Sequence, residues 1–381
     1  MMLKTLPPKL IFYSTCLMFF CVPLGTAIIT IAGCITLTLW LFSGQFLALK
    51  NKEFLKTQQW IRPVVFLFFM PWIGMLYTAD YHMGLKFAQK SYYWSFSLVI
   101  ASLSFYRFPG EYFIKSFLAG LSLYLLYFIF FPSKIITTPK HITFSLLYVC
   151  GMLLLSFYYK NATSKKTKLA ILALFVIYFI VLIFSQGRIG YMAFILLSPI
   201  MFFNFLKGKH LIKTVFLYLI GLTLLFISNP VQYRIKLALR DIKLAHQGNY
   251  NTPIGNRIYM WQGAIKIFLH HPILGVGTGG YKSAMKQYKH NSLVHSQPHN
   301  SFLYMAVSFG IWGLIVLVWL FYILIKTSWH YKDTAEGFFI LSYSLIILIG
   351  SLTDTQILSC ATGIMLSLIT GLQSFLPNKN A

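Results

Sequence analysis

Four side chains in this sequence have the types and positions needed for chemistry on an anionic substrate: Arg188, Arg257, His299 and Asp354. A histidine such as His299 can act as a general base near neutral pH. The guanidinium groups of the two arginines offer planar pairs of donors that suit phosphate oxygens. Asp354 could orient a histidine or bind an arginine. The four residues therefore suggest a site where a base activates a hydroxyl group while cations stabilise a phosphate leaving group.

Three of these residues also have an ordinary structural explanation. Arg188 lies in FSQGRIGYMAF, where an arginine side chain can extend to the membrane interface, although Gly187 and Gly190 would permit close approach of a ligand. Arg257 could be one more surface charge on a basic loop. Asp354, in SLTDTQ, could cap the N-terminus of the last helix. The sequence leaves both explanations open for each residue.

His299 belongs to the loop HSQPHN (residues 295–300), which leads into an apolar run. Pro298 argues against a shared helical face for the two histidines of this loop. Three more histidines precede it, at positions 270, 271 and 290. No HExxH motif is present and the surrounding segment has a single carboxylate, so we expect neither a metal site nor a cofactor. His299 is the better candidate base because the helix that follows fixes its position.

Composition indicates the environment in which these residues lie. The chain of 381 residues is 57% hydrophobic and only 10% charged, whereas soluble domains carry about 25% charged residues. It is therefore expected to be a polytopic membrane protein in contact with membrane lipids. The net charge of +25 reflects basic residues at membrane borders rather than a nucleic-acid partner. The five cysteines all fall in apolar runs, which is typical of small core residues.

Hydropathy predicts an all-α fold of about twelve transmembrane helices. The expected segments are residues 10–23, 26–48, 63–78, 93–106, 112–131, 142–158, 169–185, 190–206, 211–229, 299–325, 337–352 and 355–376. Lysine and arginine are concentrated in the loops that share a side with the N-terminus, which predicts that both termini are cytoplasmic. Residues 1–381 would form one integral membrane domain, with residues 230–298 as a large periplasmic loop that caps it.

Within this loop the pattern changes along the chain. QYRIKLALRDIKLA has apolar residues at helical spacing, NYNTPIGN is typical of a turn, and RIYMWQGAIKIFLHH is a second helical pattern that should stop before Pro272. The following run, GVGTGG (Gly275–Gly280), looks like a phosphate-binding loop. No strand precedes it and no GK[ST] follows, which disfavours a nucleotide site.

Several short motifs in the second half of the chain form a familiar set. They are R-x-x-x-W (Arg257, Trp261), P-x-x-G-x-G (Pro272, Gly275, Gly277), H-N-x-x-L (His299, Asn300, Leu303) and G-x-x-G (Gly310, Gly313). With twelve expected spans and a large outer loop, the sequence resembles the O-antigen ligase superfamily. That superfamily also includes O-antigen polymerases and protein O-oligosaccharyltransferases. The resemblance is densest between residues 185 and 320.

The resemblance implies a metal-independent, inverting glycosyltransferase of the GT-C type in the bacterial inner membrane. The donor would be a glycan on undecaprenyl diphosphate, and in the ligase branch, which we favour, the acceptor is a sugar of the lipid A core. By similarity, Arg188 and Arg257 would hold the diphosphate. His299 would deprotonate the acceptor hydroxyl, and Asp354 matches an acidic residue late in the chain. One departure is Gly187-Arg188, where the family pattern has Ser-Arg.

Two other functions stay open. A polymerase or a protein-glycosylating relative would use the same donor with a different acceptor. A transporter of lipid-linked glycans would need polar residues at midplane depth within its helices, and the expected helices contain almost none.

Overall fold

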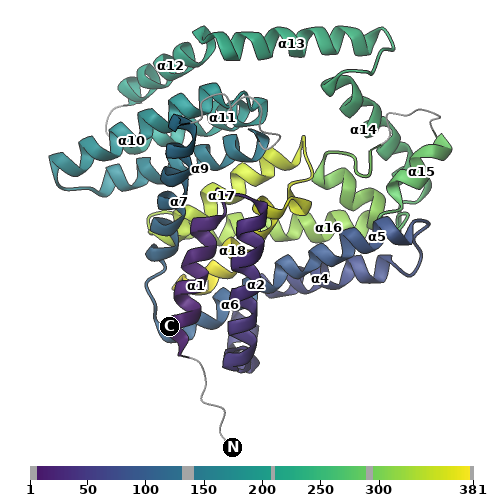
Figure 1. Ribbon diagram of the computed structural model, residues 1–381, viewed down its shortest axis with the longest axis horizontal. Coiled ribbons are helices and arrows are strands. Elements are labelled where there is room, and N and C mark those ends of the chain that lie inside the picture. The colour runs from purple at the N-terminus through teal and green to yellow at the C-terminus, as the bar shows by residue number, and fades with distance from the viewer. Residues whose placement is uncertain (1–6, 131–140, 207–210, 289–294, 378–381) are drawn as a thin grey trace, which may run out of the picture.

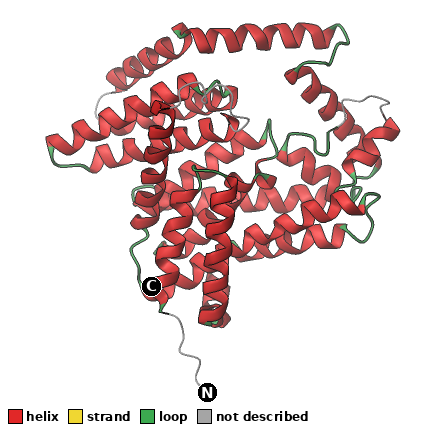
Figure 2. Ribbon diagram, viewed as in Figure 1, coloured by secondary structure: helices red, strands yellow, loops and turns green. Residues whose placement is uncertain are grey.

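The structure is a computed structural model that describes residues 7–130, 141–206, 211–288 and 295–377. Nearly all of these residues lie in helices, and no strand occurs among them (Figure 2). The expected all-α fold is therefore confirmed for this part of the chain. Helices satisfy their own backbone hydrogen bonds, which is the condition that a lipid environment imposes.

Helices occupy all twelve segments in which the sequence predicts a span. In chain order they are α1 (Pro8–Cys21), α2 (Thr26–Ser43), α4 (Ile61–Gly74), α6 (Ser95–Leu103), α7 (Glu111–Phe130), α9 (His141–Asn161), α10 (Lys165–Phe184), α11 (Arg188–Phe205), α12 (Leu211–Ile227), α16 (Ser301–His330), α17 (Ala335–Ser351) and α18 (Cys360–Leu372). Shorter helices connect them, among them α3 (Lys52–Thr57), α5 (Tyr81–Ala88) and the 3-10 turns η2 (Gln89–Trp94) and η4 (Gln356–Leu358).

Several of these helices are short for a complete crossing. A helix of 14 residues, such as α1, is about 21 Å long, whereas the hydrocarbon layer is about 30 Å thick. Among the described residues, five helices are long and apolar enough to cross a membrane, or six if the bent pair α12–α13 is one span. The structure thus supports a multi-pass membrane protein, and the number of twelve crossings stays a prediction.

The centre of the molecule is formed by α9, α17 and α18, around which the other helices pack. Every residue of α18 between Ala361 and Leu372 is buried. Close helix contacts rely on small residues, as is usual between membrane helices. A Cβ atom on Gly190 of α11 would lie only 2.3 Å from the Cβ atom of Ser145 on α9. This contact fixes the start of α11, and with it Arg188, against the centre.

In the described residues of the predicted outer cap the chain forms three helices. After α12 the chain bends by 71° into α13 (Asn229–His246), which runs across the top of the molecule in Figure 1. Then α14 (Pro253–His270) and α15 (Tyr281–Tyr288) descend along one side. Both predicted helical patterns are confirmed, and α14 ends two residues before Pro272. The predicted turn NYNTPIGN is confirmed only in its first half, because α14 already begins at Pro253. The position of this cap on the periplasmic side stays a prediction.

The glycine-rich run that follows α14 is inserted into a break in α16. Gly310, in the middle of α16, has a φ of 65° and a ψ of −153°, which interrupts the helix. The N–H group of Ile311 donates to the carbonyl oxygen of Pro272 at 2.8 Å. A Cβ atom on Gly310 would lie 2.2 Å from the carbonyl oxygen of Ile273, so only glycine fits at this position.

The main-chain donors of the glycine-rich run are used by the protein itself. The N–H groups of residues 276–278 donate, in order, to the carbonyl oxygens of Val307 (2.8 Å), Ser308 (3.1 Å) and Gly74 (3.2 Å). These donors therefore join α14 to α16 and α4 and do not cradle a phosphate. The glycines of the family motifs serve helix packing here.

Candidate active site

His299 lies at the junction between the outer cap and α16. Its φ of 49° is in the left-handed region, which is uncommon for a residue other than glycine and is often found at functional sites. The next residue, Asn300, is the N-cap of α16 and accepts a hydrogen bond from the N–H group of Leu303 at 3.0 Å. On the other side, the ring of the buried Pro298 restricts the backbone. The position of His299 is therefore fixed from both directions.

The ring of His299 is paired with Asp354. Nδ1 of His299 lies 2.9 Å from Oδ1 of Asp354, and since an ionised carboxylate can only accept, Nδ1 donates. The same oxygen accepts the N–H group of Thr355 at 2.8 Å. Burial raises the pKa of Asp354, but the hydrogen bond and charge of protonated His299, the Thr355 N–H group and Arg257 outweigh it and lower the pKa overall. Asp354 is thus ionised at neutral pH, and Nε2 of a neutral His299 is left as an acceptor.

Main-chain contacts tie the turn that carries Asp354 to the start of α16. The hydroxyl group of Ser301 donates to the carbonyl oxygen of Asp354 at 3.2 Å, and it accepts the N–H group of Gln356 at 3.0 Å. The alternative explanation, that Asp354 caps the last helix, is wrong, because Ser359 is the N-cap of α18. Asp354 and His299 are therefore held together by their own side chains and by the Ser301 hydroxyl group, which binds the backbone of the turn.

Arg257 lies in the first turns of α14, close enough to Asp354 for their charges to interact. Burial lowers the pKa of Arg257, and the carboxylate of Asp354 opposes this effect. Arg257 remains protonated under both influences, because an arginine side chain loses its proton only far above neutral pH. The structure thus brings three of the four sequence-predicted residues, Arg257, His299 and Asp354, into one place.

Arg188, the fourth residue, begins α11 and faces α13. Its Nη1 atom lies 3.6 Å from Oδ2 of Asp241, a carboxylate that is only 8% exposed. This contact is an ion pair without a direct hydrogen bond. The Nε atom of Arg188 is buried and has no hydrogen-bond partner among the described residues. A buried, unpartnered guanidinium donor is costly, which favours a ligand at this position.

A third arginine, Arg234, was not singled out by the sequence analysis. Its Nε atom donates to the carbonyl oxygen of Gln186 at 3.0 Å, in the turn before Arg188. Arg188 is close enough to both Arg234 and Arg257 for their charges to interact. The sequence did contain a signal, because Arg234 and Asp241 are seven residues apart and so share one face of α13.

The chemistry of the site follows from these charges. Three guanidinium groups lie near one another with two carboxylates, Asp241 and Asp354, among them. This excess of positive charge suits an anion with several oxygens, such as a diphosphate. The candidate general base His299, paired with Asp354, lies beside this cluster of charges. The arrangement can hold a phosphate leaving group and accept a proton from an attacking hydroxyl group.

Two of the other histidines singled out in the sequence lie far from this site. His270 and His271 lie at the far end of α14, about 20 Å from Arg257 along the helix axis, and His290 lies outside the described residues. In the part of the chain that the structure describes, no three His, Cys, Asp or Glu side chains are arranged to hold a metal ion. Among the histidines that the structure describes, His295 has its ring centroid 5.6 Å from that of His299.

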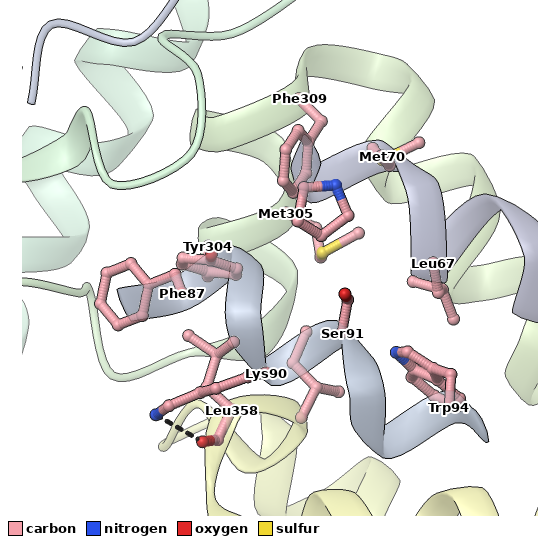
Figure 3. A pocket seen from close by; sticks show the side chains of 12 residues that line it. Leu67, Met70, Phe87, Lys90, Ser91, Trp94, Tyr304, Met305, Phe309 and Leu358 are labelled. Atoms are coloured by element: carbon pink, nitrogen blue, oxygen red, sulfur yellow. Dashed lines mark hydrogen bonds between the residues drawn. The ribbon is translucent and has the colours of Figure 1, made fainter. Parts of the chain in front are cut away.

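A small cavity lies between α4, η2, α16 and η4, the turn that follows Asp354 (Figure 3). At its edge, Nζ of Lys90 donates to the carbonyl oxygen of Leu358 at 2.8 Å, as the dashed line in Figure 3 marks. The cavity volume of about 30 Å³ can hold a water molecule but not a sugar. We therefore assign Lys90 a structural role, in which it holds η4 in place behind Asp354.

The fold and the site define a multi-pass helical membrane protein with a basic site for an anionic substrate. Residues 173–318 match the family described as O-antigen ligase, a stretch that contains Arg188, Arg257 and His299 and ends before Asp354. Over this stretch, which is less than half of the chain, the sequence is that of an O-antigen ligase family member.

A curated relative from Haemophilus influenzae is 28% identical to this chain over 162 residues. The match covers 39% of this chain and 41% of that protein, so the chain spans about two fifths of the relative's length. The relative is described as an uncharacterized protein, and its name therefore assigns no substrate.

Proposed function

We propose that this protein is an O-antigen ligase, a metal-independent, inverting glycosyltransferase. It would move a glycan from undecaprenyl diphosphate to a sugar hydroxyl group of the lipid A core. The main support for the proposal is the His299–Asp354 pair, 2.9 Å apart, which lies beside a cluster of half-buried arginines. The proposal includes a location in the bacterial inner membrane, with both termini in the cytoplasm and the site on the periplasmic face.

In the proposed reaction, Asp354 holds the Nδ1–H tautomer of His299, so that Nε2 can take the proton of the acceptor hydroxyl group. The acceptor oxygen then attacks the anomeric carbon of the donor sugar on the face opposite the diphosphate. The bond between this carbon and the diphosphate oxygen breaks, and its electron pair leaves with the diphosphate. The anomeric configuration is inverted, and the proton on His299 passes to water.

The arginines would stabilise the leaving group. Negative charge develops on the diphosphate oxygen as its bond to the sugar breaks, and fixed guanidinium donors in a partly dehydrated site stabilise that charge without reorganising. Arg188 has a buried donor atom without a partner, and Asp241 orients it. Arg257 lies between this end of the site and the base, since it interacts with both Arg188 and Asp354.

An apolar groove supports a substrate with a hydrocarbon chain. It lies between α4 and α16, has a volume of about 510 Å³, and is lined almost entirely by apolar side chains. The carbonyl oxygen of Leu274, in the glycine-rich run, accepts the hydroxyl group of Tyr77 at one end of it. A prenyl chain in this groove would lie along the helix whose N-terminus follows His299.

The proposal can be tested with purified protein, an undecaprenyl-diphosphate-linked glycan and lipid A-core acceptor, with EDTA present. We expect glycan on the lipid A core from the wild type. His299→Ala should lose transfer by about 10²-fold or more while the protein still inserts and purifies normally. The matched control is His246→Ala, because His246 is an exposed histidine at the end of α13. This variant should be fully active.

Other results would assign other functions. Longer glycans built on the donor lipid itself would identify a polymerase, and glycan on a protein acceptor would identify a protein O-oligosaccharyltransferase. Absence of transfer to any acceptor would favour a transporter. Wild-type transfer by His299→Ala would refute the proposed base.

A further inference from the structure

We propose that His295 is a positioning residue that fixes the loop of the base His299 through a hydrogen bond to Asn256, and that it must be uncharged to do so. This inference rests on the proposed function, because it assigns His295 a role in the same reaction. His295 lies four residues before His299 in the loop that leads into α16.

The first observation is the contact between His295 and Asn256. Nε2 of His295 lies 2.9 Å from Nδ2 of Asn256. An amide nitrogen only donates, so Nε2 accepts and the ring carries its proton on Nδ1. An imidazolium ring has no acceptor atom. With the Asn256 amide in this orientation, protonation of His295 would place an N–H group against an N–H group and break the contact. Only reversal of the amide, which would turn its buried Oδ1 atom, unpartnered among the described residues, toward the ring, could restore a hydrogen bond.

The second observation is what this contact connects. Asn256 is the residue before Arg257 in the first turns of α14, a helix that begins with Thr252 as N-cap. The ring of His295 meets the ring of His299 edge to face, with planes at 78°. The hydrogen bond thus links the helix that carries a phosphate-binding arginine to the loop that carries the base. It sets the spacing between leaving group and acceptor, where an error of about 1 Å can cost 10²-fold in rate.

The charges around His295 favour its neutral form. Burial lowers its pKa, and the neighbouring His299 and Lys282 of α15 lower it further. Among the described residues, the other charged groups near the pair are Arg257 on α14 and Asp354, which binds the ring of His299. The contact with Asn256 is therefore fully present above the unfolded value of about 6.5. It is lost as pH falls through the lower, folded value.

Three variants separate positioning from proton transfer. His295→Ala removes the contact, and we expect kcat to fall by about 10²-fold with the KM for the donor little changed. His295→Gln offers a carbonyl acceptor to Asn256 that cannot be protonated. We expect it to restore kcat to within a few-fold of the wild type and to reduce the loss of activity in acid. His246→Ala is again the matched control.

Asn256→Asp tests the charge directly. A carboxylate facing His295 would favour the imidazolium form and raise its pKa by about one to three units. We expect the acid limb of the kcat/KM profile to move to higher pH by a similar amount. The pH dependence of diethyl pyrocarbonate modification at His295, followed by peptide mass spectrometry, should shift in parallel. This reaction needs no substrate, so it tests the contact even if no glycan transfer is found.

The outcomes are distinct. If His295→Gln is as inactive as His295→Ala, the imidazole itself takes part in proton transfer, and the positioning role is overturned. Wild-type kcat in His295→Ala would overturn it as well. An unchanged modification profile in Asn256→Asp would show that Asn256 does not control the charge of His295. If the wild type transfers no glycan but the modification profile of Asn256→Asp shifts as expected, the proposed function is refuted. The contact between His295 and Asn256 would still be supported.

Discussion

Replacing Arg257 with lysine should impair the proposed reaction even though the positive charge is kept. The guanidinium group can give two parallel hydrogen bonds to one phosphate, whereas an ammonium group acts as a single point charge. A hydrogen bond to a charged group contributes roughly 1.5–3 kcal/mol. Loss of one such bond in the transition state should therefore lower kcat/KM by about 10- to 150-fold.

The structure also says what this substitution should leave intact. Arg257 interacts with Asp354 through charge, and a lysine would keep that interaction, so the His299–Asp354 pair should persist. The pH dependence of the remaining activity should then match that of the wild type. Arg240→Lys is the matched control, because Arg240 is an exposed arginine on α13, and its kcat/KM should not change.

The measurement is the rate of glycan transfer at several donor concentrations below saturation, which gives kcat/KM directly. If Arg257→Lys transfers glycan as fast as the wild type, the two parallel hydrogen bonds of the Arg257 guanidinium group do not contribute to the reaction. The proposed binding of the diphosphate at Arg257 would then be refuted. A matching loss in Arg240→Lys would instead indicate a general electrostatic effect of the basic cap.

Three further substitutions give independent checks. Asp354→Asn should lower kcat by about 10²-fold, because an amide can stabilise the wrong tautomer of His299; an unchanged kcat would contradict this. Asp241→Asn should lower the melting temperature, because removing one partner of a mostly buried ion pair costs about 3–5 kcal/mol, and it should lower kcat/KM for the donor because Arg188 loses the carboxylate that orients it; an unchanged melting temperature and kcat/KM would contradict this. Gly310→Ala should lower the melting temperature more than Gly248→Ala. Both glycines have positive φ, but only at Gly310 would the new Cβ atom meet backbone, whereas nothing lies within 4 Å of Gly248; equal shifts would refute the close packing.

Much of the fold could be predicted because hydropathy and helix-breaking residues are local signals. Every expected span coincides with a helix, and Pro272 marks the end of α14 as expected. Local signals do not determine where each helix begins and ends once the helices have packed together. Residues 355–376 were expected to form one span, but a 3-10 turn and the N-cap Ser359 shorten its helix to α18.

The candidate site was partly predictable for a similar reason. His299 and Arg257 stand out because they are polar residues at the ends of apolar or amphipathic runs. The residue types suggested that Asp354 joins them in one site, but the direct pairing of His299 with Asp354 depends on a contact between residues 55 positions apart, which no local signal contains. Arg234 was missed because one arginine among many in a basic helix has no distinguishing neighbour until α11 is placed beside it.

The insertion of residues 271–280 into the break of α16 has a consequence for how the protein is assembled. The carbonyl oxygens of Val307 and Ser308 receive their hydrogen bonds from this loop, and in a lipid environment they have no water to replace it. The loop is synthesised before α16, so it must remain close to the membrane until that helix arrives. Insertion of α16 and folding of the cap are then a single event, and a chain that fails in one step should fail in both.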